Sequence, residues 1–340
     1  MLKQVTLARS LKDNAVQCRV CEHFCVLKPG EWGKCGVRLN RDGHAYLAVY
    51  GDAVATHIDP IEKKPLYHFY PGSDALSIGT YGCNMSCPWC QNWELSQPRR
   101  VDYDAEAREP ALSPEELVET AARHHIRSIA YTYNEPTVFF EYTYDTAVLA
   151  HERGIQNVYV SNGFMSTEAL ASIAPYLDAI NVDLKGFTAA LYDEYCGARL
   201  EPVKRNIAAI ARDTDIWIEV TTLVVPGLND SDEELRAAAA WLASVDQDMP
   251  WHVSAFHPSY RMMGRPRTSS ASLERAYTIG KAAGLHHVYV GNIMDARREA
   301  TYCPACGQLL IERHGFEPRP SWTTPGQCHA CGASVAGRWI

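Results

Sequence analysis

Three cysteines close together carry the clearest chemical signal in the chain. Cys83, Cys87 and Cys90 form a C-x3-C-x2-C motif. Cysteine thiolates are the usual protein ligands of iron–sulfur clusters, and three of them can hold three irons of a [4Fe-4S] cluster. The fourth iron then has no protein ligand and can bind a small molecule, because an incomplete ligand set is typical of catalytic metal sites. The motif therefore predicts a reactive cluster with these three cysteines as catalytic residues.

Most of the other cysteines, out of twelve in all, fall into two groups of four. In a chain without a secretion signal, such groups indicate metal sites and not disulfides. The C-terminal group has two Cys-x2-Cys-Gly knuckles, which predict a zinc site. The N-terminal spacing fits either zinc or a second iron–sulfur cluster, and the lack of a Pro after its last cysteine favours zinc. Cys196 stands alone, and we expect it to be a buried helix residue. The two groups are Cys18, Cys21, Cys25 and Cys35, and Cys303, Cys306, Cys328 and Cys331.

The elements that must position these cysteines alternate between strand and helix. This alternation, repeated about six times, predicts an α/β fold with a parallel sheet, namely a partial (β/α)6 TIM-like barrel, with a doubly wound open sheet as the alternative. Capping boxes at Ser113 and Ser231 mark two helix starts. We expect an N-terminal module at 1–72, the barrel at 73–298 and a C-terminal module at 299–340. The expected strands are 75–79, 128–133, 157–161, 179–184, 216–223 and 252–256, and 288–290 is a further candidate.

Polar residues follow several of these strands. The cysteine motif follows the first strand, and the carboxyl ends of parallel strands converge on one mouth, where the chemistry of such folds sits. We therefore expect the polar strand-end side chains to share one cavity with the cysteines. They are Asn134-Glu135, Ser161-Asn162, Asp183 and Lys185, Thr221-Thr222 and His257. The alternative role for Glu135, Asp183 and Lys185 is a buried ion-pair network that closes the barrel mouth.

The cysteine motif resembles that of the radical S-adenosylmethionine (SAM) superfamily. Three further runs, 160–164, 182–185 and 224–230, and the strand end at His257 resemble its activating-enzyme branch, which installs glycyl radicals on pyruvate formate-lyase and its relatives. The N-terminal cysteine module and the C-terminal knuckles, with 57–72 and 131–136, resemble a narrower group. That group is the radical SAM member of the AmmeMemoRadiSam system. The resemblance to it spans essentially the whole chain.

The resemblance implies a fold, a reaction and a set of residue roles. It implies a radical SAM barrel in which the open iron binds SAM and an electron from the cluster breaks a sulfur–carbon bond. The 5′-deoxyadenosyl radical formed in this way abstracts hydrogen from a protein or small-molecule substrate. Glu135 matches the residue that receives the SAM amino group, although Asn-Glu-Pro replaces the Gly-Gly-Glu of relatives. Lys185 pairs with the SAM carboxylate beside Asp183, Ser161 or Asn162 replaces a missing Asp contact, and His257 lies near the adenosyl group.

The resemblance also implies partners. These are a low-potential electron donor such as flavodoxin or ferredoxin, and either Memo-type and Ammecr-type proteins or a glycyl radical enzyme. The net charge of −8 and the lack of a long basic run argue against nucleic acid. The lack of an apolar signal core and of an 18-residue apolar run predicts a cytoplasmic protein that does not enter membranes. A function of another class is a non-catalytic metal-binding protein that docks partners and whose central cluster is structural.

Overall fold

A central eight-stranded sheet organises the computed structural model, which describes residues 1–97 and 111–339. Strands β8 to β14 pair in parallel, each with the next in chain order, and β7 pairs antiparallel with β8 at one edge. The α/β class with a parallel sheet is confirmed, and the open sheet is consistent with a partial barrel. The strands are β7 (Ala55–Pro60), β8 (Asp74–Gly79), β9 (Ser128–Tyr131), β10 (Gln156–Ser161), β11 (Ala179–Asp183), β12 (Trp217–Val224), β13 (Trp251–Ala255) and β14 (Val288–Gly291).

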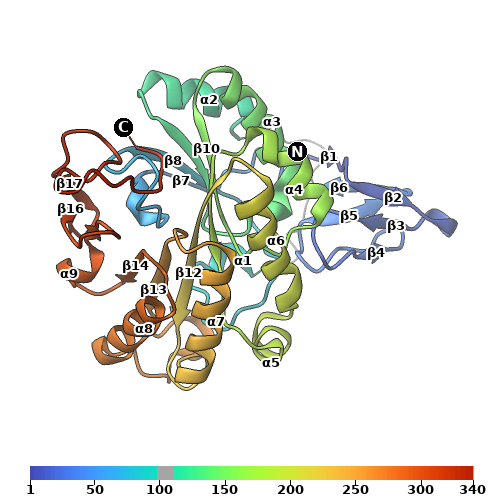
Figure 1. The fold of residues 1–340 in the computed structure, drawn as a ribbon. Coiled ribbons are helices and arrows are strands. Elements are labelled where there is room, and N and C mark those ends of the chain that lie inside the picture. Colours follow the sequence, from blue (N-terminus) through green and yellow to red (C-terminus); the bar gives the residue numbers. More distant parts are fainter. Residues whose placement is uncertain (98–110, 340) are drawn as a thin grey trace.

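Helices connect the parallel strands and cover the outer face of the sheet (Figure 1). The sheet is buried on both faces, so its strands are nearly continuous apolar runs, as parallel strands usually are. Among the described residues, no helix is both long enough and apolar enough to cross a membrane. The helices are α1 (Trp93–Ser96), α2 (Pro114–Arg123), α3 (Phe140–Glu152), α4 (Thr167–Ile173), α5 (Ala189–Leu191), α6 (Leu200–Asp213), α7 (Asp232–Val245), α8 (Ser270–Ala282) and α9 (Ala296–Glu299).

One of the two predicted capping boxes forms completely. At the start of α2, Ser113 and Glu116 exchange side-chain and backbone hydrogen bonds in both directions. At the start of α7, the Ser231 hydroxyl accepts from the Glu234 backbone N–H, but the Glu234 carboxylate accepts from the Phe187 N–H at 2.6 Å instead of returning to Ser231. A tertiary contact thus replaces half of the local motif.

The N-terminal residues form two small antiparallel sheets, β1-β6-β5 and β2-β3-β4. The predicted hairpin is present: Arg41 pairs with His44, and Asp42 and Gly43 turn the chain with φ of 54° and 86°, as an Asp-Gly turn allows. Strand β7 comes from the same part of the sequence but belongs to the central sheet. The strands are β1 (Lys3–Gln4), β2 (Ala8–Ser10), β3 (Val16–Cys18), β4 (Val26–Leu27), β5 (Arg38–Arg41) and β6 (His44–Leu47).

The C-terminal residues form a third small sheet on the other side of the molecule from the N-terminal sheets (Figure 1). It has a small core of its own, made of Cys303, Leu310, Ile311, Cys328 and Val335. Buried Arg313 ties it to the segment 57–72 by donating to the Tyr67 carbonyl oxygen at 2.8 Å. Its strands are β15 (Thr301–Tyr302), β16 (Leu309–His314) and β17 (Glu317–Pro320).

Candidate functional site

The loop that follows β8 places the three central cysteines on the wall of one large cavity. Cys83, Cys87 and Cys90 all line this cavity of about 780 Å³. Gly79 ends β8 where an added Cβ would lie 2.8 Å from the Thr132 carbonyl oxygen, and Gly82 has a φ of 90°, so both positions require glycine. The strand end and these glycines set the path of the loop.

Glu135 lies beside the cysteines and is held by four hydrogen bonds, one of them from the Thr137 hydroxyl at 2.5 Å. It follows β9, and its carboxylate accepts from the Ser161 hydroxyl at 2.8 Å, from the Asn162 backbone N–H at 2.7 Å and from the Thr137 N–H at 3.1 Å. It is only 2% exposed. Burial raises the pKa of this carboxyl, although the hydrogen bonds from Thr137, Asn162 and Ser161 oppose the shift. The carboxylate is thus fixed in place at the edge of the cavity, and a bound cation would stabilise its charge.

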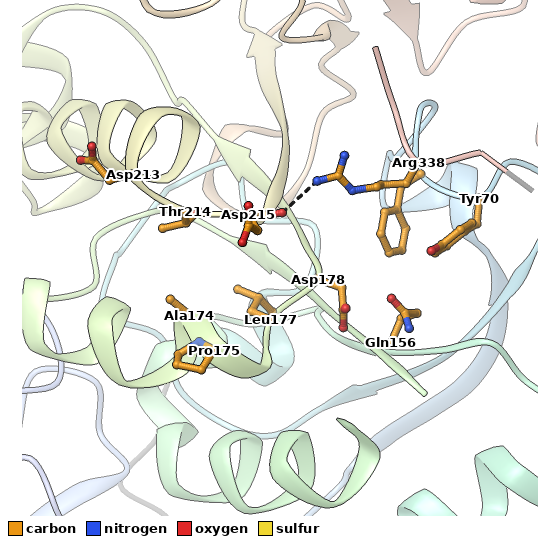
Figure 2. Close-up of a pocket in the computed structure, with 11 residues that line it drawn as sticks. Tyr70, Gln156, Ala174, Pro175, Leu177, Asp178, Asp213, Thr214, Asp215 and Arg338 are labelled. Atoms are coloured by element: carbon orange, nitrogen blue, oxygen red, sulfur yellow. Dashed lines mark hydrogen bonds between the residues drawn. The ribbon is translucent and has the colours of Figure 1, made fainter. Parts of the chain in front are cut away.

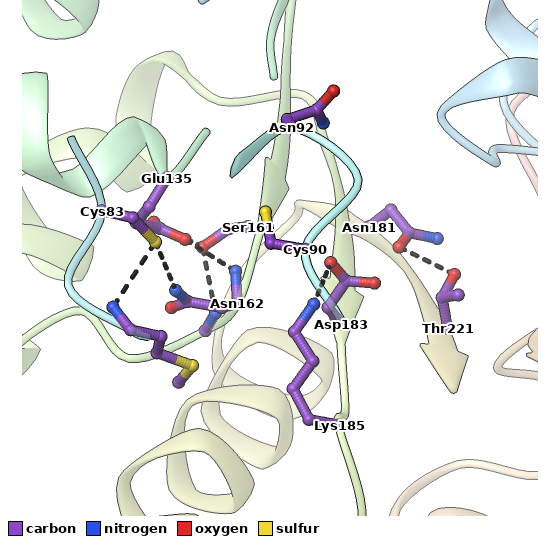
Figure 3. Close-up of polar contacts among 12 residues, drawn as sticks. Cys83, Cys90, Asn92, Glu135, Ser161, Asn162, Asn181, Asp183, Lys185 and Thr221 are labelled. Atoms are coloured by element: carbon purple, nitrogen blue, oxygen red, sulfur yellow. Dashed lines mark hydrogen bonds and ion pairs between the residues drawn. The ribbon is translucent and has the colours of Figure 1, made fainter. Parts of the chain in front are cut away.

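Asp183 and Lys185 lie at the end of β11 and form an ion pair of 2.7 Å. Figure 3 shows this pair and the Glu135 group reaching toward the cysteine loop from separate strand ends. Burial alone would lower the pKa of Lys185, but Asp183 and then the Cys87 thiolate raise it above its ordinary value. Lys185 is therefore a fixed cation next to the cysteines, able to bind a carboxylate.

The other predicted contacts differ in how close they come to the cavity. Asn162 lines it, with its amide nitrogen 3.8 Å from Cys83 Sγ and 2.8 Å from Asn84 Oδ1. Ser161 is buried and holds Glu135, and it is not among the residues that line the cavity. His257 is not a lining residue either: it lies behind Asn292, whose carbonyl oxygen its Nε2 contacts at 3.2 Å. The structure thus brings Glu135, Asn162, Asp183 and Lys185 to one cavity with the cysteines.

Cys196 lies beside Cys87, a contact that the sequence did not predict. It is fully buried in a helical turn, as expected, and the neighbouring Cys87 side chain raises the pKa of its thiol. The two residues are 109 positions apart in a chain whose loops bring them together, so no local pattern marks the pair.

Sequence reasoning missed the far wall of the cavity. It comes from the segment 57–72 and from the C-terminal module, and it includes Glu62, Lys64, Tyr67, Glu299 and Phe316. Ion pairs hold this wall in place: Lys64 Nζ, for example, lies 3.1 Å from Asp59 Oδ2. The Pro-punctuated sequence of 57–72 suggests either a linker or a lid over the barrel, and in the structure the segment forms part of the cavity wall.

Glu62 is the most unusual group in this wall. It is 1% exposed; one of its carboxylate oxygens accepts from the Gly72 N–H at 2.9 Å, and the other, Oε2, has no hydrogen-bond partner among the described residues. Burial raises its pKa to about 7, although Arg313 nearby opposes the shift. A buried carboxylate oxygen without a partner is costly, so this end of the cavity favours a ligand that donates a hydrogen bond.

A second hollow, of about 330 Å³, lies at the opposite ends of the strands (Figure 2). Gln156, Asp178 and Asp215 line it near the starts of β10, β11 and β12, and Arg338 donates to the Asp215 carbonyl oxygen at 3.1 Å. None of the predicted site residues lines it. Because chemistry in β/α folds is located at the carboxyl ends of the strands, the larger cavity is the candidate site.

The C-terminal cysteines form a compact group. Their four sulfur atoms lie within 4.8 Å of one another, and the Cys303–Cys331 and Cys306–Cys328 pairs are each 3.6 Å apart. Four thiolates at this spacing fit one tetrahedral metal ion. The four N-terminal cysteines line a separate small cavity instead.

Comparison with known proteins agrees with this arrangement. The model of the radical SAM superfamily matches residues 77–241, which contain the cysteine loop, Glu135, Asp183 and Lys185. An uncharacterized protein of Methanocaldococcus jannaschii is 41% identical over 321 residues, which cover 94% of this chain and 93% of that protein. A second protein of the same organism, provisionally named a glycyl-radical enzyme activating enzyme, is 23% identical over 54% of this chain and 68% of its own length.

One solved structure with a likeness to the chain is a domain of the pyruvate-formate lyase-activating enzyme from Bacteroides vulgatus. It is 17% identical, covers 48% of this chain and 98% of its own, and has a TM-score of 0.43. The assignment rests on the sequence comparisons and on the cysteine loop. The chain belongs to the radical SAM superfamily, a family that implies a [4Fe-4S] cluster and SAM as cofactors.

Proposed function

We propose that this chain is an enzyme that cleaves SAM reductively and uses the resulting radical to take a hydrogen atom from a substrate in the same cavity. The observation that carries the proposal is a cavity in which three cysteines, without a fourth among the described lining residues, face a fixed carboxylate and a fixed cation. When bound at these cysteines, the cluster supplies the electron that splits the sulfonium of SAM into methionine and a 5′-deoxyadenosyl radical.

The strand-end residues have complementary roles in binding SAM. Lys185 binds the methionyl carboxylate, and Asp183 keeps Lys185 oriented through its 2.7 Å ion pair. Glu135 accepts the amino group, because its buried carboxylate gains most from a nearby cation. Ser161 fixes Glu135, and Asn162 offers its amide beside Cys83. His257 orders the Asn292 loop on the adenosyl side.

The rest of the cavity is the substrate compartment in this proposal. The volume of about 780 Å³ lies in the upper part of the 300–1,000 Å³ range of small-molecule pockets. The wall is shared by the segment 57–72 and by Phe316 of the C-terminal module. We retain the division into modules 1–72, 73–298 and 299–340 as part of the proposal, with zinc in the C-terminal module and a cytoplasmic location.

The proposed partners follow from the family and from the relatives. A low-potential donor such as flavodoxin or ferredoxin supplies the electron. The resemblance of the two cysteine modules supports a role in the AmmeMemoRadiSam system, with Memo-type and Ammecr-type proteins as companions. A second candidate is the installation of a glycyl radical on a partner enzyme, which the name of one M. jannaschii relative supports.

The experiment is anaerobic reconstitution of the full chain, followed by SAM and dithionite and detection of 5′-deoxyadenosine. The proposal predicts 5′-deoxyadenosine from the wild type and none from Cys83→Ala. A fully loaded cluster that yields no 5′-deoxyadenosine would overturn it and favour the non-catalytic docking protein. Pull-downs with each companion and with a glycyl radical enzyme then separate the two partner proposals.

A further inference from the structure

The far wall of the large cavity holds two buried carboxylates, those of Glu62 and Glu299. They are 1% and 5% exposed, and both residues line the cavity. The Asp295 N–H donates to Glu299 Oε1 at 3.1 Å, and the Gly72 N–H donates to Glu62 Oε1 at 2.9 Å. Glu62 Oε2 has no hydrogen-bond partner in the part of the chain that the structure describes. Because a buried carboxylate oxygen without a partner is costly, a ligand that brings N–H donors would stabilise this wall.

The other carboxylates of the cavity wall have partners of their own. Asp59 and Asp183 each form an ion pair of 2.7 Å with a lysine that also lines the cavity. Glu135 receives the SAM amino group in the proposed function. Among the described lining residues, Glu62 and Glu299 are therefore the carboxylates that remain for the substrate.

Arg313 lies near both of these carboxylates and balances their charge only in part. Burial raises the pKa of Glu62 and of Glu299, and Arg313 opposes both shifts. The terminal nitrogens of Arg313, however, donate to neutral oxygens: the carbonyls of Glu299 and Tyr67, at 3.1 and 2.8 Å, and the Thr301 hydroxyl at 2.7 Å. One guanidinium thus faces two carboxylates, and a cation on a ligand would complete the charge balance.

Two aromatic side chains accompany the carboxylates on this wall. Burial raises the pKa of Tyr67 against the opposing effect of Arg313, and Glu299 and Glu62 raise it further, so both carboxylates lie close to this residue. Phe316, at the turn between β16 and β17, also lines the cavity and is half exposed. Carboxylates beside aromatic surface suit a cation that is carried on an apolar stem.

Glu62 and the cysteine loop lie at opposite ends of β8. Strand β7 runs antiparallel to β8, so Pro60 pairs with Asp74 at the start of β8, and Glu62 follows two residues later. The cysteine loop follows Gly79, at the other end of this six-residue strand. Six residues of strand span roughly 20 Å. A group bound at Glu62 is therefore remote from the cysteines and would orient the substrate without taking part in the hydrogen transfer.

We propose that Glu62 and Glu299 bind a protonated amine or guanidine group of the substrate and so orient the substrate for hydrogen abstraction. The substrate is then an organic cation whose charged end is carried on an apolar stem. The C-terminal module takes part in binding it, because that module contributes Glu299 and Phe316 to the cavity. The orienting role rests on the proposed function, whereas binding of the cation can be measured without it.

The test compares small cations with a neutral molecule of the same stem. The full chain is reconstituted anaerobically and titrated with n-butylamine, n-butylguanidine and n-butanol, with saturation-transfer difference nuclear magnetic resonance as the measure of binding. At least one of the two cations should bind about tenfold or more tightly than n-butanol, because each can form charge-assisted hydrogen bonds with the carboxylates. The double variant Glu62→Gln/Glu299→Gln should reduce this preference to within about twofold.

The control variant is Glu317→Gln, in which an exposed glutamate of the same module changes in the same way. It should keep the wild-type preference for the cation, and circular dichroism confirms that both variants fold. Equal binding of the cations and n-butanol to the wild type would overturn the proposal, and so would a preference that persists in the double variant. Cation binding by a wild type that forms no 5′-deoxyadenosine from SAM would instead count against the proposed function and leave the cation site in place.

Discussion

The C-terminal and central cysteine groups use the same side chain in two different surroundings. The four C-terminal sulfur atoms lie within 4.8 Å of one another over a small apolar core, so protein ligands alone can complete the coordination of one metal ion. The central three line a cavity of about 780 Å³ that also holds Glu135, Asp183 and Lys185. A closed ligand set is typical of a structural metal and an open one of a catalytic metal.

The comparison predicts opposite effects of two matched substitutions. Cys87→Ala should reduce SAM cleavage at least about a thousandfold, or about 4 kcal/mol of transition-state stabilisation, and leave the fold intact. Cys303→Ala should remove the C-terminal metal and lower the melting temperature, while SAM cleavage stays within about tenfold, because structural metals contribute to folding. Activity assays, circular dichroism and metal analysis measure both.

Equal losses of activity in the two variants would break the distinction between the sites. So would retention of the cluster and of SAM cleavage in Cys87→Ala.

Lys185→Met tests whether the charged wall binds SAM. We expect the Kd for SAM to rise about a hundredfold, or about 2.7 kcal/mol, because a buried charge-assisted hydrogen bond to the carboxylate is lost and Asp183 is left unpaired. Equilibrium dialysis of reconstituted protein measures the Kd. Lys204→Met is the control, since Lys204 pairs with Glu201 on α6. An unchanged Kd in Lys185→Met would indicate that the Asp183–Lys185 ion pair closes the barrel mouth and does not bind SAM.

Glu62→Gln tests the wall where the cavity meets the C-terminal module. Burial raises the Glu62 pKa from an ordinary 4.5 to about 7. Below 4.5 the group is protonated in both states, so the substitution should change little. As the pH rises from 4.5 to 7, Glu62 is deprotonated in the unfolded chain but still protonated in the folded one, so the free energy of unfolding falls. Above pH 7 the carboxylate is charged in both states, and the full cost of burying that charge is present. The variant should therefore be more stable by about 3 kcal/mol at pH 8 and by much less at pH 5.

Urea unfolding at the two pH values measures the Glu62 effect. A stability gain that is the same at both would show that Glu62 does not titrate between them.

Glu135→Gln should have the smallest effect, about tenfold on the Kd for SAM, or about 1.4 kcal/mol. Because burial raises the Glu135 pKa, the wild type should bind SAM more weakly as the pH falls through that raised value and the carboxylate is neutralised. The variant should lose this dependence. A parallel fall in affinity in both proteins would assign the dependence to another group.

Much of the site was predictable because its residues follow strands. The run from Ala75 to Gly79 is apolar except for Ser77, so the cysteine loop could be placed at a strand end, and Glu135 and Lys185 likewise follow mostly apolar runs. His257 could not be judged, because its direction depends on its contact with the loop that carries Asn292, which no local pattern indicates. Glu62 and Lys64 were missed because β7 pairs antiparallel with β8, a long-range choice that returns their segment to the cavity.

Electron–nuclear double resonance tests the central claim most directly. Reduced wild-type protein is mixed with SAM that carries ¹⁵N in its amino group. If the open iron binds SAM, the spectrum of the cluster should show a ¹⁵N hyperfine coupling. This coupling should be absent when the protein is mixed with unlabelled SAM. A loaded cluster whose spectrum is the same with and without SAM, under conditions where dialysis shows SAM bound, would contradict the account.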